Sequence, residues 1–74
     1  MSRPPDARTA VVSSWLSSMH YSIEAILELE LRSGAIYRYF AVPPAVVQGL
    51  IAAESKGAYF NRHISNHYRY QRLA

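Results

Sequence analysis

The sequence contains no cysteine, which excludes disulfide bonds and thiolate metal sites and favours a reducing compartment. It has no run of about 20 apolar residues, the length that a membrane-spanning helix requires. Its first eight residues are too polar for the apolar core of a signal peptide. These absences predict a soluble, cytoplasmic protein with no membrane partner.

The sequence also lacks the motifs of a catalytic site. Its three glycines are scattered and form no phosphate-binding loop. The serines near the N-terminus lie on a predicted strand, without the base and acid that nucleophilic catalysis requires. His63 and His67 are four residues apart, but no cysteine or carboxylate follows to complete a metal site. We therefore expect a protein that is not an enzyme and that holds no metal or cofactor.

Acidic residues are scarce in the C-terminal half of the chain. Seventy-four residues allow one small domain, which would bury only ~60% of the surface of its unfolded chain. Residues 1–30 carry two arginines against four acidic residues, whereas residues 31–74 carry six cations and one acid. This asymmetry predicts an anionic partner, although such charge can also serve solubility alone.

The pattern of apolar residues predicts an arm followed by one domain. Residues 1–11 combine two prolines with charged and small residues, which indicates a flexible arm. The domain is expected over residues 12–74. Apolar and polar residues alternate over 14–21 and most clearly over 26–32, which is typical of half-buried strands. With a central strand over 36–40, these segments predict a three-stranded antiparallel β-meander.

The hairpin before the central strand has two possible registers. A two-residue loop would pair Leu29 with Arg38 and would put that charge on the leucine face. A three-residue loop, with Gly34 in the left-handed conformation, instead pairs Leu29 with Tyr37 and Glu28 with Arg38. We prefer the longer loop, because a slip of one residue turns every side chain over and only this register keeps charge off the core.

Two prolines and an apolar stripe predict a main helix over residues 44–55. Pro44 suits the first helical position, and Lys56-Gly57 is typical of a helix end. Gly49 should weaken the helix by ~1 kcal/mol unless close packing requires it. A short helical turn is expected over residues 58–64, so the fold class is α+β. The stripe consists of Val46, Val47, Leu50, Ile51 and Ala53.

Several segments occur in an order that is typical of one family. They are Val12-Ser13-Ser14, Leu27-Glu28-Leu29-Glu30, Ser33-Gly34, Tyr37-Arg38-Tyr39-Phe40, Val42-Pro43-Pro44, and Ala53-Glu54-Ser55-Lys56-Gly57 followed by Tyr59-Phe60-Asn61. This order resembles the KTSC domain family, a short domain found at the C-terminus of some lysyl-tRNA synthetases and as a free-standing bacterial protein. The chain departs from the family pattern in a shortened link at residues 22–25 and at Val47 and Gly49.

The resemblance implies a small α+β domain. For function it implies no reaction. RNA binding has been suggested for the family, and the association of the domain with a tRNA-handling enzyme favours RNA by analogy.

Residues 62–72, which run from the second helical segment into the C-terminal tail, interleave cations with aromatic rings and contain no acidic residue. Such a surface can neutralise phosphates and stack unpaired bases, so we expect it to bind RNA, or less readily DNA. The alternative is that the tyrosines of the tail only pin it to the sheet. The candidate binding residues are Arg38, Lys56, Arg62, His67, Tyr68, Arg69, Tyr70 and Arg72.

Two other surfaces compete with the tail. Tyr37 and Tyr39 could stack bases, as aromatic residues on open sheets do, but the preferred register puts both rings in the core. Ile26, Ile36 and Phe40 would form an apolar strip on the outer face, which the tail or a partner must cover. The alternative function is therefore a protein-interaction or dimerisation module that uses this strip.

Overall fold

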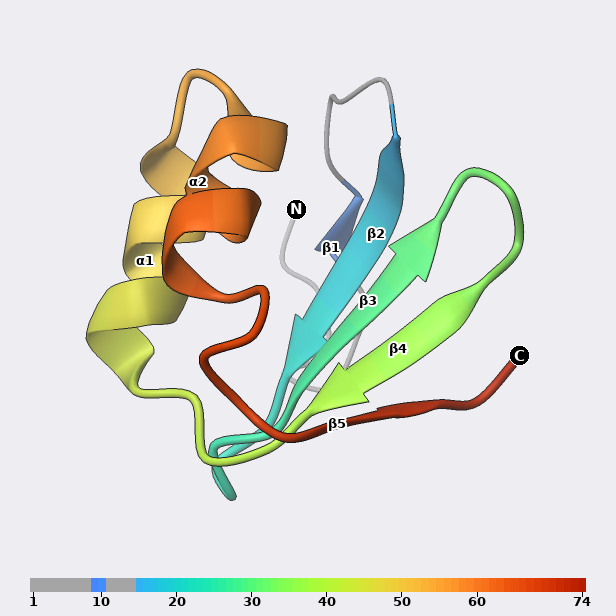
Figure 1. Ribbon diagram of the computed structural model, residues 1–74, viewed down its shortest axis with the longest axis horizontal. Coiled ribbons are helices and arrows are strands. Elements are labelled where there is room, and N and C mark those ends of the chain that lie inside the picture. The colour runs from blue at the N-terminus through green and yellow to red at the C-terminus, as the bar shows by residue number, and fades with distance from the viewer. Residues whose placement is uncertain (1–8, 11–14) are drawn as a thin grey trace, which may run out of the picture.

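A computed structural model describes residues 9–10 and 15–74. These residues form an α+β fold, in which one antiparallel sheet of five strands carries two helices on one face (Figure 1). The strands follow one another across the sheet in chain order. The elements are β1 (Thr9–Ala10), β2 (Leu16–Tyr21), β3 (Leu27–Leu31), β4 (Ile36–Tyr39), α1 (Pro44–Ala52), α2 (Lys56–His63) and β5 (Tyr70–Arg72).

The predicted register of the central hairpin is confirmed. Leu29 lies opposite Tyr37, and Glu28 lies opposite Arg38. Gly34 closes the loop with a φ of 96°, a conformation that side chains with a Cβ rarely adopt. The leucines of β3 therefore face the helices, while its glutamates lie on the outer face of the sheet.

The predicted three-stranded sheet is too small, because the C-terminal tail forms a further strand. β5 pairs antiparallel with β4, so that Tyr70 lies opposite Tyr39 and Arg72 lies opposite Tyr37. Every residue of β5 is exposed, and the strand has no apolar alternation to announce it. Pairing with β4 provides its backbone with hydrogen-bond partners, which the tail could not find alone.

The N-terminal edge of the sheet also differs from the expectation. Thr9–Ala10 pair with β2, and the rest of the predicted arm over residues 1–11 lies outside the described residues. In β2 the register shifts between Leu16 and Ser18. The extra residue turns Leu16 to the face that holds Met19, where both are buried. The alternation predicted over residues 14–21 is therefore interrupted between Leu16 and Ser18.

The main helix begins at Pro44, as predicted, but ends at Ala52. Lys56 lies beyond the end of this helix, at the first position of α2. Its Nζ reaches back and donates to the carbonyl oxygens of Ile51 and Ala53, at 3.1 and 3.2 Å. The side chain therefore satisfies carbonyl groups that the end of the helix leaves without partners, and its charge suits that end.

The second helical segment is longer than the predicted turn over residues 58–64, since α2 begins at Lys56. Ser55 caps it: its Oγ accepts a hydrogen bond of 3.2 Å from the backbone N–H of Ala58. The prediction of Lys56-Gly57 as a helix stop is therefore wrong. Ser55, a residue type that favours the N-cap position, indicates the start of a new helix here more reliably than Lys56-Gly57 indicates the end of one.

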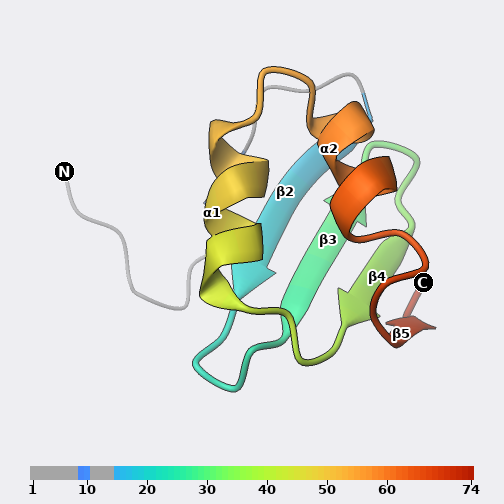
Figure 2. The ribbon, with the colours of Figure 1, turned by 60° about the vertical axis from the view of Figure 1, so that its left-hand side comes forward.

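The core lies between the helices and the sheet, and Figure 2 shows β4 and β5 at the edge away from α1. Of the predicted stripe on α1, Val47 and Leu50 are buried, whereas Ile51 is 48% exposed. The largest side chains with less than 2% of their surface exposed are Leu16, Leu27, Leu29, Leu50, Ile64 and Val42.

α1 and α2 pack closely at Gly49. The ring of Tyr59 lies against this glycine, and its hydroxyl donates a hydrogen bond of 2.9 Å to the carbonyl oxygen of Val46. A Cβ at Gly49 would come closer than 3.0 Å to the hydroxyl end of that ring. The departure from the family pattern at Gly49 is therefore explained by close packing.

Candidate nucleic-acid interface

The tail and the central strand form one exposed edge of the sheet. The backbone N–H of Phe40 donates to the carbonyl oxygen of Arg69 at 2.9 Å, and that of Leu73 donates to Ile36 at 2.7 Å. β5 is the last strand of the sheet among the described residues. We call this edge the β4–β5 ribbon, defined as Tyr37, Arg38, Phe40, Arg69, Tyr70 and Arg72.

Each of two arginines on the ribbon lies over an aromatic ring. The guanidinium carbon of Arg69 is 5.8 Å from the centre of the Phe40 ring. That of Arg72 is 5.7 Å from the centre of the Tyr37 ring, and its Nε donates to the carbonyl oxygen of Ala74 at 2.9 Å. Cation–π contacts of this kind limit the motion of an exposed side chain while its charge stays in water.

The third arginine of the ribbon is partly neutralised. Arg38 forms an ion pair with Glu28 on the outer face, with 3.3 Å between Nη2 and Oε2, and its side chain is 39% exposed. The pair is the cross-strand contact that the register predicts. Arg38 therefore offers less positive charge to a partner than Arg69 or Arg72 does.

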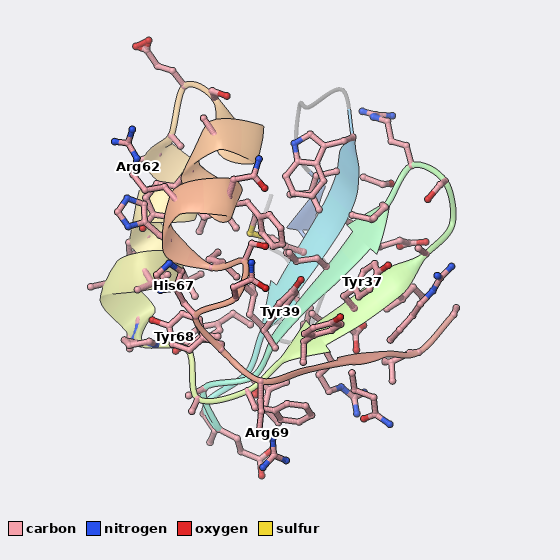
Figure 3. The ribbon with its side chains drawn as sticks, in the orientation of Figure 1. Tyr37, Tyr39, Arg62, His67, Tyr68 and Arg69 are labelled. Atoms are coloured by element: carbon pink, nitrogen blue, oxygen red, sulfur yellow. The ribbon has the colours of Figure 1, made fainter. Side chains whose placement is uncertain are left out.

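The other candidate residues lie away from the ribbon. Figure 3 shows Arg62 and His67 on the side of the helices, and Arg69 below them, just before the start of β5. Lys56 caps the C-terminal end of α1, as described above. Tyr68 is half-buried and packs against the core. The structure thus brings together four of the eight candidate residues, Arg38, Arg69, Tyr70 and Arg72, and leaves Lys56, Arg62, His67 and Tyr68 elsewhere.

The apolar strip of the alternative function is partly covered. Ile26, Ile36 and Phe40 are each half-buried, and Arg69 lies over the ring of Phe40. A protein partner or a homodimer that uses this strip stays a prediction.

Three tyrosines gather on the inner face of the ribbon. The ring of Tyr70 lies 5.5 Å from that of Tyr39 and 5.9 Å from that of Tyr37, measured between ring centres. Tyr39 is buried and belongs to the core, Tyr37 is half-buried, and Tyr70 is 59% exposed. The core position is confirmed for Tyr39, while Tyr37 both packs on the core and reaches the surface.

A pocket of about 510 Å³ opens beside these tyrosines, between the sheet, α2 and the loop after α2. Aromatic side chains from separate parts of the chain line it, among them Trp15, Phe60 and Tyr70. Two asparagines, Asn61 and Asn66, also line it, and none of the lining residues is charged. Sequence reasoning missed this site, because its residues come from six segments and share no spacing.

The described residues offer no metal site, since no three of their histidine, aspartate or glutamate side chains gather closely enough to hold an ion. His63 instead lies against the ring of Tyr59, with 4.4 Å between ring centres. In the same part of the chain, neither helix is long and apolar enough to cross a membrane.

The sequence pattern of the KTSC domain matches residues 12–68. The chain belongs to the KTSC domain family. Its fold is also that of the KTSC domain protein of Yersinia pestis, whose crystal structure is similar with a TM-score of 0.86. The two sequences are 29% identical, and the similarity covers 92% of this chain and 97% of the other.

Similar sequences occur in proteins of different length. An uncharacterised protein of Stutzerimonas stutzeri is 53% identical over 68 residues, which are 89% of this chain and 96% of that protein. The lysine–tRNA ligase of Trichormus variabilis is 37% identical over 62 residues, which are 82% of this chain and 11% of the ligase. That of Nostoc punctiforme is 42% identical over 48 residues, 65% of this chain and 9% of the ligase. The chain thus spans about a tenth of these ligases.

Burial raises the pKa of Tyr39 in this KTSC domain to about 12, and repulsion from the phenolates of Tyr70 and Tyr37 adds to the shift. The folded protein therefore holds this proton more tightly than the unfolded chain, in which the pKa is about 10. The resulting contribution to stability is complete below pH 10 and is lost as the pH rises to about 12.

We expect the free energy of unfolding to fall over this range by no more than about 3 kcal/mol, which is the free energy that separates a pKa of about 12 from one of 10. Urea unfolding at a series of alkaline pH values measures the loss. Tyr39→Phe is the control, because phenylalanine does not titrate, and its stability should depend less on pH. Equal pH dependence in the two proteins would contradict the assignment to Tyr39.

Proposed function

We propose that this protein is a non-enzymatic module that binds RNA with unpaired nucleotides through the β4–β5 ribbon. The observation that carries the proposal is the placement of Arg69 and Arg72 over aromatic rings on either side of the exposed Tyr70. Cations that contact phosphates and a ring that stacks a base are the two elements of single-strand binding.

The geometry of the ribbon suits a chain of nucleotides. β5 lies at an edge of the sheet, so a strand of RNA can run along it without meeting the helices. Arg69 and Arg72 are three residues apart, which is about 10 Å along a β-strand. Their side chains lie on opposite faces of the ribbon, over Phe40 and Tyr37. They can therefore hold two separate phosphates.

The comparisons favour RNA over DNA as the partner. Two of the similar sequences are segments of lysine–tRNA ligases, whose names state that they act on a tRNA. This support is by analogy, because the similar segment is about a tenth of each ligase. The charge and stacking groups of the ribbon would suit either nucleic acid.

Substitution of the two ribbon arginines should reduce the salt dependence of RNA binding. Anisotropy of a labelled, unpaired oligoribonucleotide gives the affinity over a series of salt concentrations. A plot of log affinity against log salt should lose about 0.7 of its slope for Arg69→Ala or Arg72→Ala, and about 1.4 for the double variant, since each arginine displaces counterions from one phosphate.

Arg62→Ala is the matched control, because it removes the same charge from the exposed side of α2, away from the ribbon. Its slope should stay close to that of the wild-type protein. A ribbon variant with an unchanged slope, or a control variant with an equal loss, would overturn the assignment of the site.

A further inference from the structure

We infer that the pocket between the sheet and α2 binds one unpaired nucleobase of the RNA strand held by the β4–β5 ribbon. This inference rests on the proposed function, which supplies the RNA strand, and it adds the pocket as a second binding site. The pocket adjoins the ribbon, because Tyr37 and Tyr70 belong to the ribbon and also line the pocket. A strand on the ribbon can therefore turn a base into it.

The size and lining of the pocket suit a flat aromatic group. Its volume of about 510 Å³ lies within the ~300–1,000 Å³ that is usual for sites of small molecules. The ring of Phe60 lies 5.4 Å from that of Trp15 and 5.6 Å from that of Tyr39, tilted at 55° and 78°. These tilted and edge-to-face arrangements are the ones that aromatic rings prefer, and a further flat ring can join such a cluster from the open side of the pocket.

Two amides provide hydrogen-bonding groups at the same pocket. Asn61 lies on α2, and Asn66 lies in the loop that follows it. Each side-chain amide presents a donor and an acceptor, and the edge of a nucleobase presents the same groups. Asn66 has a φ of 66°, a left-handed conformation that asparagine tolerates better than most residues. Its side chain is exposed, so binding a base need not break a buried contact.

The charges around the pocket favour a nucleotide over a charged small molecule. The lining residues carry no charge, which suits a neutral base and disfavours an ion inside. A guanidinium lies just outside, since Arg72 sits over the ring of Tyr37. Arg72 would thus lie near the phosphate of a nucleotide whose base occupies the pocket.

The chain carries its own probe of the pocket, because Trp15 is its only tryptophan and lines the site. The test compares the affinity and the Trp15 emission for two ligands, an oligomer of unpaired adenosines and an abasic oligomer with the same number of phosphates. The adenosine oligomer should change the emission of Trp15 and should bind roughly 5- to 150-fold more tightly, the range that stacking of one base supplies. The abasic oligomer should leave the emission unchanged.

Two variants test the amides without touching the ribbon. Asn66→Gly removes the side chain and keeps the left-handed backbone, and Asn61→Ala suits its helical position. Each should weaken the adenosine oligomer by about 2- to 12-fold, as the loss of one hydrogen bond predicts. Neither should change the affinity of the abasic oligomer or the salt slope. Circular dichroism shows whether each variant remains folded.

The outcomes separate this inference from the proposed function. If the adenosine oligomer binds without changing Trp15 emission, and neither asparagine variant weakens it, the pocket takes no base and the inference is overturned, while salt-dependent binding still supports the ribbon. If no oligomer binds but adenosine monophosphate changes Trp15 emission, the pocket takes a base and the RNA proposal is wrong. If neither the oligomers nor adenosine monophosphate has any effect, both are overturned.

Discussion

Replacement of Leu50 by alanine should lower the free energy of unfolding by about 2–5 kcal/mol, the usual cost of emptying a leucine site in a core. Leu50 has no exposed surface and lies on the side of α1 that faces the sheet. A domain of this size has a total stability of roughly 4–11 kcal/mol, at ~0.05–0.15 kcal/mol per residue. The variant should therefore lose a large part of its stability.

Ile51→Ala is the matched control, because it removes a side chain of similar size from the next position of the same helix. Ile51 is 48% exposed, so its loss should lower stability by less than about 1 kcal/mol. Urea unfolding followed by circular dichroism measures both variants. Equal losses at the two positions would contradict the burial that the structure assigns to them.

This pair also shows how far apolar periodicity can be trusted. The sequence places Leu50 and Ile51 on one apolar stripe, since spacings of three and four residues from Val47 reach both. The structure buries only Leu50, because α1 ends at Ala52 and the chain then turns to α2. A stripe predicts which face of a helix is apolar, but the neighbouring elements decide how wide a part of it is covered.

The register of the central hairpin could be predicted, because local rules agree there. Pleating, the charge of Arg38 and the conformation that Gly34 permits all require the same pairing. The loop is short, so no distant part of the chain enters the choice. Agreement between independent local rules is what made this prediction reliable.

The candidate site was harder to predict, because it depends on contacts between distant segments. β5 has no apolar alternation and becomes a strand only beside β4. Lys56 looks like one more cation of the basic C-terminal half, yet its Nζ donates to the carbonyl oxygens of Ile51 and Ala53 at the end of α1. The pocket needs residues from β3, β4, α2, the loop after α2, β5 and the segment before β2. The spacing of residues in the sequence does not indicate these contacts between distant segments.

Gly49 is where a local rule and the packing of the fold oppose each other. Helix propensity alone predicts that Gly49→Ala stabilises α1 by ~1 kcal/mol. The added methyl group would, however, come closer than 3.0 Å to Oη, Cζ and Cε2 of Tyr59. Relief of that clash would move the ring and weaken the hydrogen bond from its hydroxyl to the carbonyl oxygen of Val46. Overpacking of this kind usually costs about 1–3 kcal/mol.

We therefore expect Gly49→Ala to destabilise the wild-type protein by about 1–3 kcal/mol and to stabilise a Tyr59→Ala background by up to about 1 kcal/mol. Urea unfolding of the four proteins in this double-mutant cycle measures the coupling between the two sites. Gln48→Ala is the control for helix propensity, because Gln48 is exposed and directly precedes Gly49 in α1. It should change stability little in either background. If Gly49→Ala stabilised both backgrounds, the close approach of Tyr59 could not be the reason for this glycine. The inversion of sign is the decisive result, because neither helix propensity alone nor a general loss of packing would produce it.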